Sequence, residues 1–458
     1  MVDDGQAAPS LFLHVMTRFL PGGCGSGLKG FDMFRAELTV EDALAGMKKL
    51  QPKIERYADL IVRKGVNVQP GQEVVIQAPI ETASFVRALT ARAYAAGAGH
   101  VTVIWGDDEL TRLTYEHVET SWFETVPEWQ RLQLDSLAEA GACFIFVEGA
   151  DPEALKGIDP AKPAAASKAR NTQCAVFRRG LDFNINPWCI AGAPVAAWAR
   201  HVFPGAADEV AVYRLWCAIL SVARADGEDP EAAWELHDAT FEKNLRFLNE
   251  RHFDRLHYTS ENGTDLTIGL TDKHVWDGGS TVTPAGVDFF PNIPTEEVFT
   301  SPDCERVDGI VYSALPLVRH GNKIDRFWLR FEGGRVVDYD AEVGKETLKS
   351  ILETDEGARR LGEVALISKN TPIRESETLF YDTLYDENAS CHLALGMGFA
   401  ECYEGGADMT PEQLREHGVN KSSTHVDFMI GADDLDITGI TASGEEVPVF
   451  VNGQWPWE

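Results

Sequence analysis

Two different spacings of apolar residues alternate along the first third of the chain. Apolar runs typical of buried strands occupy residues 73–77, 100–105 and 142–147. Residues 52–64 and 82–96 instead repeat their apolar positions with the period of a helix. Buried strands that alternate with amphipathic helices are typical of parallel sheets covered by helices. The pattern therefore predicts an N-terminal α/β domain with parallel strands.

The pattern changes towards the second half. Residues 151–171 are expected to form a helical or loop excursion, followed by a further strand at 173–177. A long helix is predicted from Asp229 to Arg251, because aspartate caps a helix and the proline after it suits the first helical position. Beyond this helix, segments such as 264–270 alternate polar and apolar residues, as does 326–332 before a Gly-Gly turn. We expect these later strands to be antiparallel and the long helix to connect two domains.

Length and pattern together divide the chain. A chain of 458 residues exceeds the usual size of one domain, and we place a boundary near residue 252, between an α/β domain (47–251) and an α+β domain (252–458). Residues 1–46 are expected to be a disordered extension. Alternatively, the start codon has been assigned too far upstream and these residues are not part of the natural protein. A short apolar run within them resembles a signal-peptide core, but acidic residues precede it where a signal peptide carries basic ones.

Charge and cysteine content narrow the classes of function. The chain has 72 acidic and 41 basic residues, a net charge of −31, which repels nucleic acids and anionic membranes, so neither is expected as a partner. The acidic composition is compatible with adaptation to high salt and equally with an ordinary soluble acidic enzyme. Eight dispersed cysteines without a paired spacing indicate a reducing cytoplasm. No apolar run approaches the roughly 18 residues needed to span a bilayer.

The polar residues that could carry chemistry lie in the second half. The sequence contains no HExxH, no GxSxG and no phosphate-binding glycine loop. His425 and Asp427 are separated by one residue, so on a strand both side chains would share a face and could bind one metal ion. His392 is placed at a loop-to-helix junction, where a histidine is more often a capping or packing residue. Glu297 and Glu363 stand among apolar neighbours, where a buried carboxylate is unfavourable unless paired or bound to metal, although both could equally be exposed.

The segments around these residues together resemble one enzyme family. From about Tyr57 to the C-terminus, the chain is similar to the metallo-aminopeptidases typified by aminopeptidase T and aminopeptidase S. The matching motifs are NIPTEEVFTSP (292–302), TDEGARRLGEVAL (354–366), LYDENASCHLALG (384–396) and HVDFMIGADDLDITG (425–439). The resemblance implies a C-terminal catalytic domain that acts on peptides, and a homodimer.

The resemblance also implies the residues of the site. The positions that match the family's ligands for two divalent ions are Glu297, Glu363, His392, His425 and Asp427. The ions would be Zn²⁺, Co²⁺ or Mn²⁺, which suit mixed imidazole and carboxylate ligands. Glu297 and Glu363 would also be catalytic, because the two ions would share a carboxylate and a water of lowered pKa that attacks the first peptide bond. The neighbouring Glu296 would not bind an ion itself and would at most contact one of the residues that do.

One position departs from the family. A tyrosine commonly stands seven residues after the ligand histidine, and here that position is Phe399. A phenyl ring can neither ligate a metal nor donate a conventional hydrogen bond. Tyr403 follows four residues later, and on a helix it would lie one turn along the same face, where it could supply the missing phenol.

Two other functions stay open at this point. Dihydroxypyridine dioxygenases look like distant relatives of this fold, and the two histidines with the aspartate could form the Fe(II) site of a mononuclear ring-cleaving dioxygenase. The presence of both glutamates argues against that function. The other alternative is an inactive peptide-binding homologue, which is supported only by Phe399 in place of the family's tyrosine.

Overall fold

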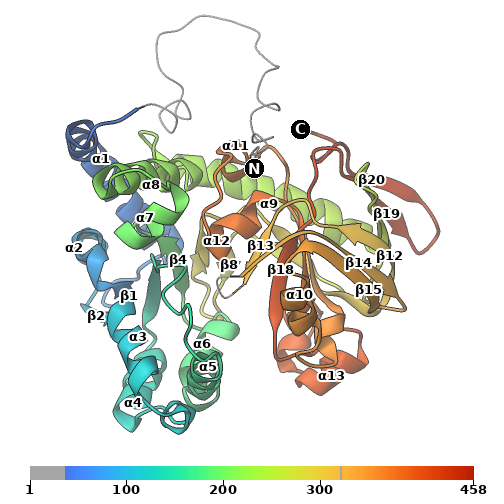
Figure 1. Ribbon diagram of the computed structural model, residues 1–458, viewed down its shortest axis with the longest axis horizontal. Helices are drawn as coiled ribbons and strands as arrows, with labels where there is room; N and C mark the ends of the chain where they lie inside the picture. The colour runs from blue at the N-terminus through green and yellow to red at the C-terminus, as the bar shows by residue number, and fades with distance from the viewer. Residues whose placement is uncertain (1–36, 320–321) are drawn as a thin grey trace, which may run out of the picture. The chain divides into compact units, whose positions relative to one another are not determined.

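The computed structural model describes residues 37–319 and 322–458, of which Leu38–Glu458 form one compact unit. Residues 1–36, and with them most of the expected N-terminal extension, lie outside the described residues. Helix α1 (Val40–Leu60) begins inside the segment assigned to that extension (Figure 1). Its capping box pairs Thr39 with Asp42. Residues 40–46 are therefore helical, and the expectation of disorder is wrong for them.

A five-stranded parallel sheet is built largely by the first half of this unit. The strand order is β10-β4-β3-β1-β2, and all neighbours are parallel. The strands are β1 (Glu73–Pro79), β2 (His100–Gly106), β3 (Cys143–Glu148), β4 (Trp188–Gly192) and β10 (Asn292–Ile293). The helices along this part are α2 (Ala83–Ala95), α3 (Asp108–His117), α4 (Glu128–Glu139), α5 (Ala161–Gln173), α6 (Ala175–Asp182), α7 (Ala196–Val202) and α8 (Asp208–Val222). The predicted α/β class with parallel strands is confirmed.

The strand predicted at residues 173–177 is wrong. Helix α5 ends at Gln173 and α6 begins at Ala175. Phe177 and Leu181 lie four residues apart on one face of α6, and both are buried in the core that α4 and α6 form against β1 and β3. A few apolar residues fit a helical stripe as well as a short strand, and packing against the sheet decides for the helix.

Antiparallel sheets follow the long helix α9 (Pro230–Arg251). This helix begins where it was predicted, and the side chain of Asp229 caps it by accepting a hydrogen bond from the Ala232 N–H. The larger sheet has the order β13-β14-β12-β6-β5-β19-β20, with β15 also paired to β14. Its strands are β5 (Phe253–Thr259), β6 (Asp265–Leu270), β12 (Pro302–Tyr312), β13 (Leu317–Arg319), β14 (Asn322–Glu332), β15 (Arg335–Val343), β19 (Asp436–Thr441) and β20 (Glu446–Phe450). The antiparallel strands predicted at 264–270 and 326–332 are confirmed.

The smaller antiparallel sheet has the order β18-β17-β16-β11-β7. Its strands are β7 (Asp277–Gly278), β11 (Val298–Thr300), β16 (Leu361–Leu366), β17 (His392–Gly396) and β18 (His425–Met429). One face is apolar, and residues such as Val364, Leu393 and Phe428 share a core with Leu256 and Phe327 of the larger sheet. The remaining short elements are the pair β8 (Thr281–Val282) and β9 (Asp288–Phe289), and the helices α10 (Lys345–Leu352), α11 (Pro372–Glu375), α12 (Thr383–Asp386) and α13 (Pro411–Glu416).

His392 begins strand β17, so the predicted loop-to-helix junction is wrong. The run after it is buried on both faces of the sheet, which removes the alternation that would have marked it as a strand.

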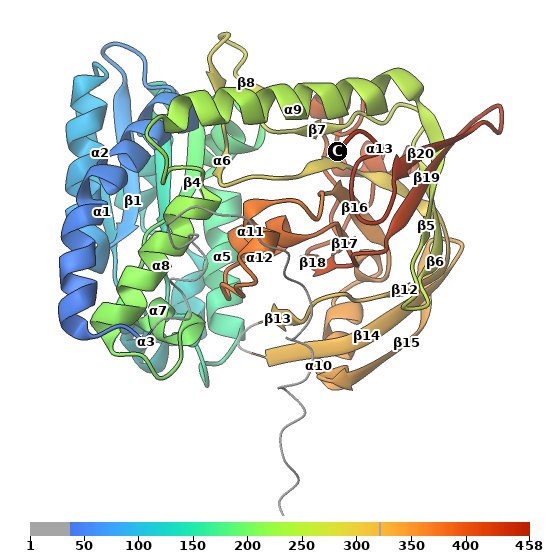
Figure 2. The ribbon, with the colours of Figure 1, turned by 90° about the horizontal axis from the view of Figure 1, so that it is seen from above.

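The two halves of the unit are joined by α9 and by one strand. Helix α9 contacts α1, β7 and β11, and Figure 2 shows it extending from the helices of the parallel sheet to the antiparallel sheets. Strand β10 lies beyond residue 252 in the chain, yet it pairs with β4. The boundary near residue 252 stays a prediction. None of the helices in the described ranges combines the length and the apolar composition of a transmembrane span. The cysteines in these ranges are free and buried.

Candidate metal centre

The face of the smaller sheet that points away from the core gathers the predicted site residues. Glu363 on β16 is opposite Ala394 on β17, and Ala394 is opposite Asp427 on β18, so these three side chains share a face. His392 and His425 each lie two residues along a strand from this row and therefore point to the same face. Because Ala394 carries only a methyl group, it leaves room between the two carboxylates.

Glu297 joins this group from the residue before β11. Its Oε2 lies 3.3 Å from Nε2 of His392. Two sets of side chains each bring their possible ligand atoms within 4.8 Å of one another: Glu297, Glu363 and His392 form one set, and Glu363, His425 and Asp427 form the other. All five predicted ligands are thus brought together, and Glu363 is common to both sets.

Both histidines are oriented by backbone carbonyls. His392 Nδ1 lies 3.0 Å from the carbonyl oxygen of Glu387, and His425 Nδ1 lies 2.8 Å from that of Met397. A carbonyl only accepts, so each Nδ1 carries the hydrogen and donates. The Nε2 atoms then face carboxylates, as with His425 Nε2 at 3.1 Å from Glu363 Oε2. In a neutral imidazole this Nε2 would carry a lone pair, which repels the negative charge of the carboxylate. A proton or a metal cation therefore has to lie between the two groups. Metal-binding histidines are commonly oriented in this way.

The site is a buried acidic cluster. Burial raises the pKa of Glu363. Burial opposes protonation of the histidines, but hydrogen bonds to Asp427 and Glu363 outweigh it and raise the pKa of His425 to about 11. The hydrogen bond to Glu297 has the same effect on His392, whose pKa rises to about 10. A cation held between an imidazole and a carboxylate would take the place of the proton that these shifts favour there.

Glu387 is a further carboxylate that the sequence did not single out. It lies in the 3-10 turn Glu387–Ala389 and lines the same cavity as the five predicted ligands. Burial, followed by the negative charges of Glu297 and Asp427, raises its pKa well above the usual range. The available signal was an acidic residue five positions before His392, which an exposed loop would have explained equally well.

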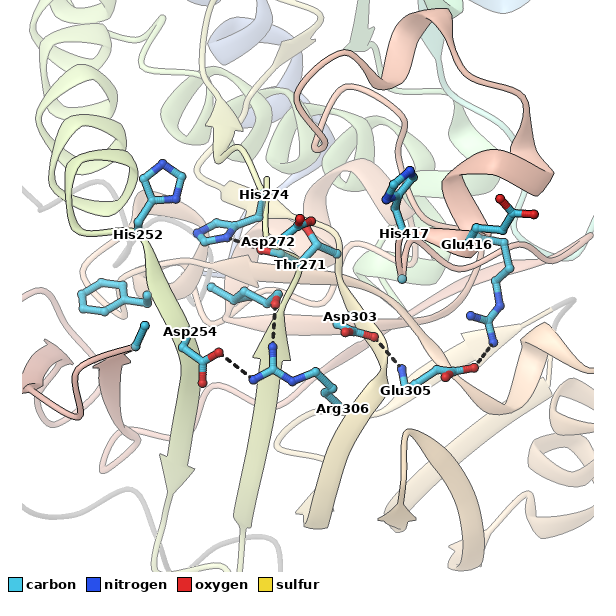
Figure 3. A pocket seen from close by; sticks show the side chains of 15 residues that line it. His252, Asp254, Thr271, Asp272, His274, Asp303, Glu305, Arg306, Glu416 and His417 are labelled. Atoms are coloured by element: carbon cyan, nitrogen blue, oxygen red, sulfur yellow. Dashed lines mark hydrogen bonds and ion pairs between the residues drawn. The ribbon is translucent and has the colours of Figure 1, made fainter.

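Glu296 and Tyr403 point elsewhere. The carboxylate of Glu296 faces Arg224. The Tyr403 hydroxyl donates to Asp272 over 3.2 Å, and its ring stacks on His417 with centroids 5.1 Å apart. Asp272 and His417 line a separate cavity of about 790 Å³ (Figure 3). Residues 397–402 form no helix, so the helical-turn argument is wrong, and Tyr403 is not brought to the cluster.

The cluster opens into a cavity of about 960 Å³ that both halves of the unit line. Phe399 forms part of its wall, with its ring centroid 5.1 Å from that of His425. Its backbone N–H donates to Ser301 Oγ over 2.7 Å. On the other side, side chains of α5 and α6 such as Arg170 and Arg178 line the cavity. The acidic cluster is therefore open to a ligand much larger than a metal ion.

Comparison with known proteins gives the family. The model of the family described as "Thermophilic metalloprotease (M29)" matches residues 50–455. The chain belongs to this family. The M29 chain is 47% identical over 409 residues to aminopeptidase AmpS of Bacillus subtilis (strain 168), covering 89% of this chain and 100% of that protein. It is 43% identical to aminopeptidase 2 of Geobacillus stearothermophilus, with 90% and 100% covered.

A solved structure agrees with the fold of this M29 chain. Wild-type AmpT from Thermus thermophilus matches with a TM-score of 0.83 and 40% identity, covering 89% of this chain and 100% of that one. A 2,5-dihydroxypyridine dioxygenase from Pseudomonas putida KT2440 reaches only a TM-score of 0.42 and 10% identity, which lends the dioxygenase alternative no support. The predicted metalloprotease family is confirmed.

Proposed function

We propose that this chain is an aminopeptidase that binds two divalent ions in the acidic cluster and releases the N-terminal residue of peptides. The observation that carries the proposal is the pair of ligand sets that share Glu363. A carboxylate between two closely spaced ions is the arrangement expected of a two-metal hydrolase. The aminopeptidase names of the relatives support the choice of reaction.

The charge of the cluster supports two ions. Four carboxylates, those of Glu297, Glu363, Glu387 and Asp427, line the cavity together with the two histidines. With neutral imidazoles and all four carboxyl groups ionised, the cluster would carry four negative charges, which two divalent cations would balance. Nearby cations would favour the ionised forms of Glu363 and Glu387, whose pKa values burial raises. Imidazole and carboxylate ligands together suit Zn²⁺, Co²⁺ or Mn²⁺.

The residues have separable roles in this proposal. Glu297 and His392 hold one end of the centre, His425 and Asp427 hold the other, and Glu363 lies between them. When bound, the ions would polarise the scissile carbonyl and lower the pKa of a water. Glu387 stands beside the ligands as a carboxyl group able to hold or release a proton.

Recognition of the free N-terminus follows from the charge of the cavity. Asp277 and Glu401 line it, and burial raises the pKa of both carboxyl groups, that of Glu401 to about 7. A protonated α-amine brought close to them would favour their charged forms and be held by them in turn. The interior of a polypeptide offers no such amine, so we expect cleavage at the first peptide bond.

The proposal also includes a cytoplasmic homodimer. The family resemblance supports the dimer, and the dispersed free cysteines support the cytoplasmic location.

Replacement of Glu363 by glutamine tests the proposal. We expect the wild-type protein to bind two ions per chain, and Glu363→Gln to lose at least about 10³-fold of the metal-dependent release of N-terminal amino acids, because a charge-bearing ligand near two cations is worth several kcal/mol. Elemental analysis and a panel of aminoacyl reporter substrates measure both quantities. Glu346→Gln, at an exposed position of α10, is the control with the same loss of charge. Full activity in Glu363→Gln would overturn the assignment, and a single iron per chain would favour the oxygenase.

A further inference from the structure

Next to the proposed metal centre, Glu296 is held by a buried ion pair with Arg224. Arg224 Nη1 lies 2.5 Å from Oε1 and Nη2 lies 2.9 Å from Oε2, while the Glu296 side chain is only 3% exposed. A pair of parallel charge-assisted bonds fixes the direction of a carboxylate as well as its charge. His237 adds to this, with Nε2 2.8 Å from the carbonyl oxygen of Thr295. The Thr295–Glu296 segment is thus held firmly from the side of α8 and α9.

The same segment is held from the side of the metal centre. The Glu296 N–H donates to Oδ1 of the buried Asn388 over 2.7 Å. Asn388 directly follows Glu387, whose carbonyl oxygen orients His392. One hydrogen bond therefore joins the segment that carries Glu297 to the segment that carries His392, and Glu296 lies at that junction.

The backbone of Arg224 is unusual for an arginine. Its φ of +53° is in the left-handed region, at the end of α8. The Ala225 N–H donates to Leu220 O and the Arg224 N–H to Ser221 O, which is the Schellman pattern that commonly places glycine at this position. A non-glycine residue in this conformation is disfavoured, and such residues persist where their surroundings hold them. The ion pair with Glu296 supplies that contact.

We propose that Arg224 is a positioning residue for the metal centre. It holds the Glu296 carboxylate on one side of the chain, so the adjacent Glu297 carboxylate is directed to the other side, 3.3 Å from His392 Nε2. Through this contact the connection between α8 and α9 sets the affinity of the centre for its ions. The inference rests on the proposed two-metal function of that centre.

A double-mutant cycle tests the role. Arg224→Met removes the guanidinium, Glu296→Gln removes the carboxylate charge, and the double variant leaves no unpaired charge in the interior. We expect Arg224→Met to weaken Zn²⁺ binding at least tenfold and to lower kcat more than it changes KM. The double variant should regain the unfolding midpoint of the wild type, because it leaves no unpaired charge in the interior. Its Zn²⁺ affinity should stay low, because nothing then fixes the direction of the side chain at position 296.

The measurements are Zn²⁺ dissociation constants from chelator competition on the full chain, kcat and KM on an aminoacyl reporter, and urea unfolding. Arg306→Met is the matched control, since Arg306 pairs with Asp254 in the larger sheet, away from the centre, and should leave Zn²⁺ affinity unchanged. Recovery of both stability and Zn²⁺ affinity in the double variant would show a merely structural ion pair and overturn the inference, as would wild-type affinity in Arg224→Met. A wild-type chain that binds no divalent ion would overturn the proposed function as well.

Discussion

A buried acidic pair at the two ends of the short helix α12 predicts an unusual dependence of stability on pH. Asp382 precedes α12, and burial, followed by the charges of Glu148 and Asp386, raises its pKa from 3.8 to about 8. Burial also raises the pKa of Asp386 to about 7. Both carboxyl groups therefore hold their protons more tightly in the folded protein than in the unfolded chain. The perturbation that isolates this effect is Asp382→Asn, which removes the ionisable group and keeps its size and its hydrogen-bond acceptor.

The sign and the magnitude follow from the shift. An acid whose pKa is raised on folding binds more protons in the folded state between its two pKa values, so the free energy of unfolding falls as pH rises through that window. For Asp382 the window runs from 3.8 to about 8. At about 1.4 kcal/mol per pH unit, the wild type loses at most about 4 kcal/mol between pH 4 and pH 7 through this group. Since Asp386 titrates in the same range and shares the effect, we expect Asp382→Asn to be more stable than the wild type by about 2 to 4 kcal/mol at pH 7.

Urea unfolding at pH 5, 6, 7 and 8, at constant ionic strength and with the metal centre saturated, measures the effect. The advantage of the variant should grow with pH and be smallest at pH 5. Asp355→Asn is the control of opposite sign: burial opposes ionisation of Asp355, but hydrogen bonds from Ser423 and Ser422 outweigh it and lower its pKa, so that variant should be less stable at neutral pH. An Asp382→Asn variant whose stability difference does not change with pH, or that is less stable at pH 8, would refute the reasoning.

Two further variants test the walls of the site. Phe399→Tyr adds a hydroxyl group to a ring whose centroid is 5.1 Å from that of His425. A hydrogen-bond donor at a developing oxyanion accelerates the reaction, so this variant should raise kcat at least roughly tenfold with little change in KM. Phe399→Leu should show no gain, and an equal kcat in Phe399→Tyr and wild type would contradict this role. Gly362→Ala would put a methyl carbon against the carbonyl oxygen of Met397, closer than a Cβ atom can approach, so it should lower the free energy of unfolding by about 1 to 3 kcal/mol and weaken metal binding at the adjacent Glu363. Gly227→Ala, with no heavy atom within 4 Å of the added carbon, should change neither quantity.

The sequence by itself predicted the types of most long elements and five residues that the structure brings together in one acidic cluster. Long apolar runs separated by helical stripes identify β1 to β3 with the helices around them, because periodicity over many residues depends little on the rest of the fold. The start of α9 followed from local capping at Asp229. The five proposed ligands were identified through the resemblance of extended motifs to a family, since each residue alone had an ordinary explanation.

Tertiary structure alone decided the short elements and the contacts between distant segments. The segments at 173–177 and 392–396 have too few residues to show a period, and their neighbours make one a helix and the other a buried strand. The junction of Arg224 with Glu296 joins residues 72 positions apart, and although Glu296 lies in the motif NIPTEEVFTSP, nothing in the sequence indicates Arg224 as its partner. Glu387 likewise becomes part of the site only when the turn before β17 brings it beside Glu297 and His392. Proximity of this kind arises from the packing of the sheets, which no local pattern of residues encodes.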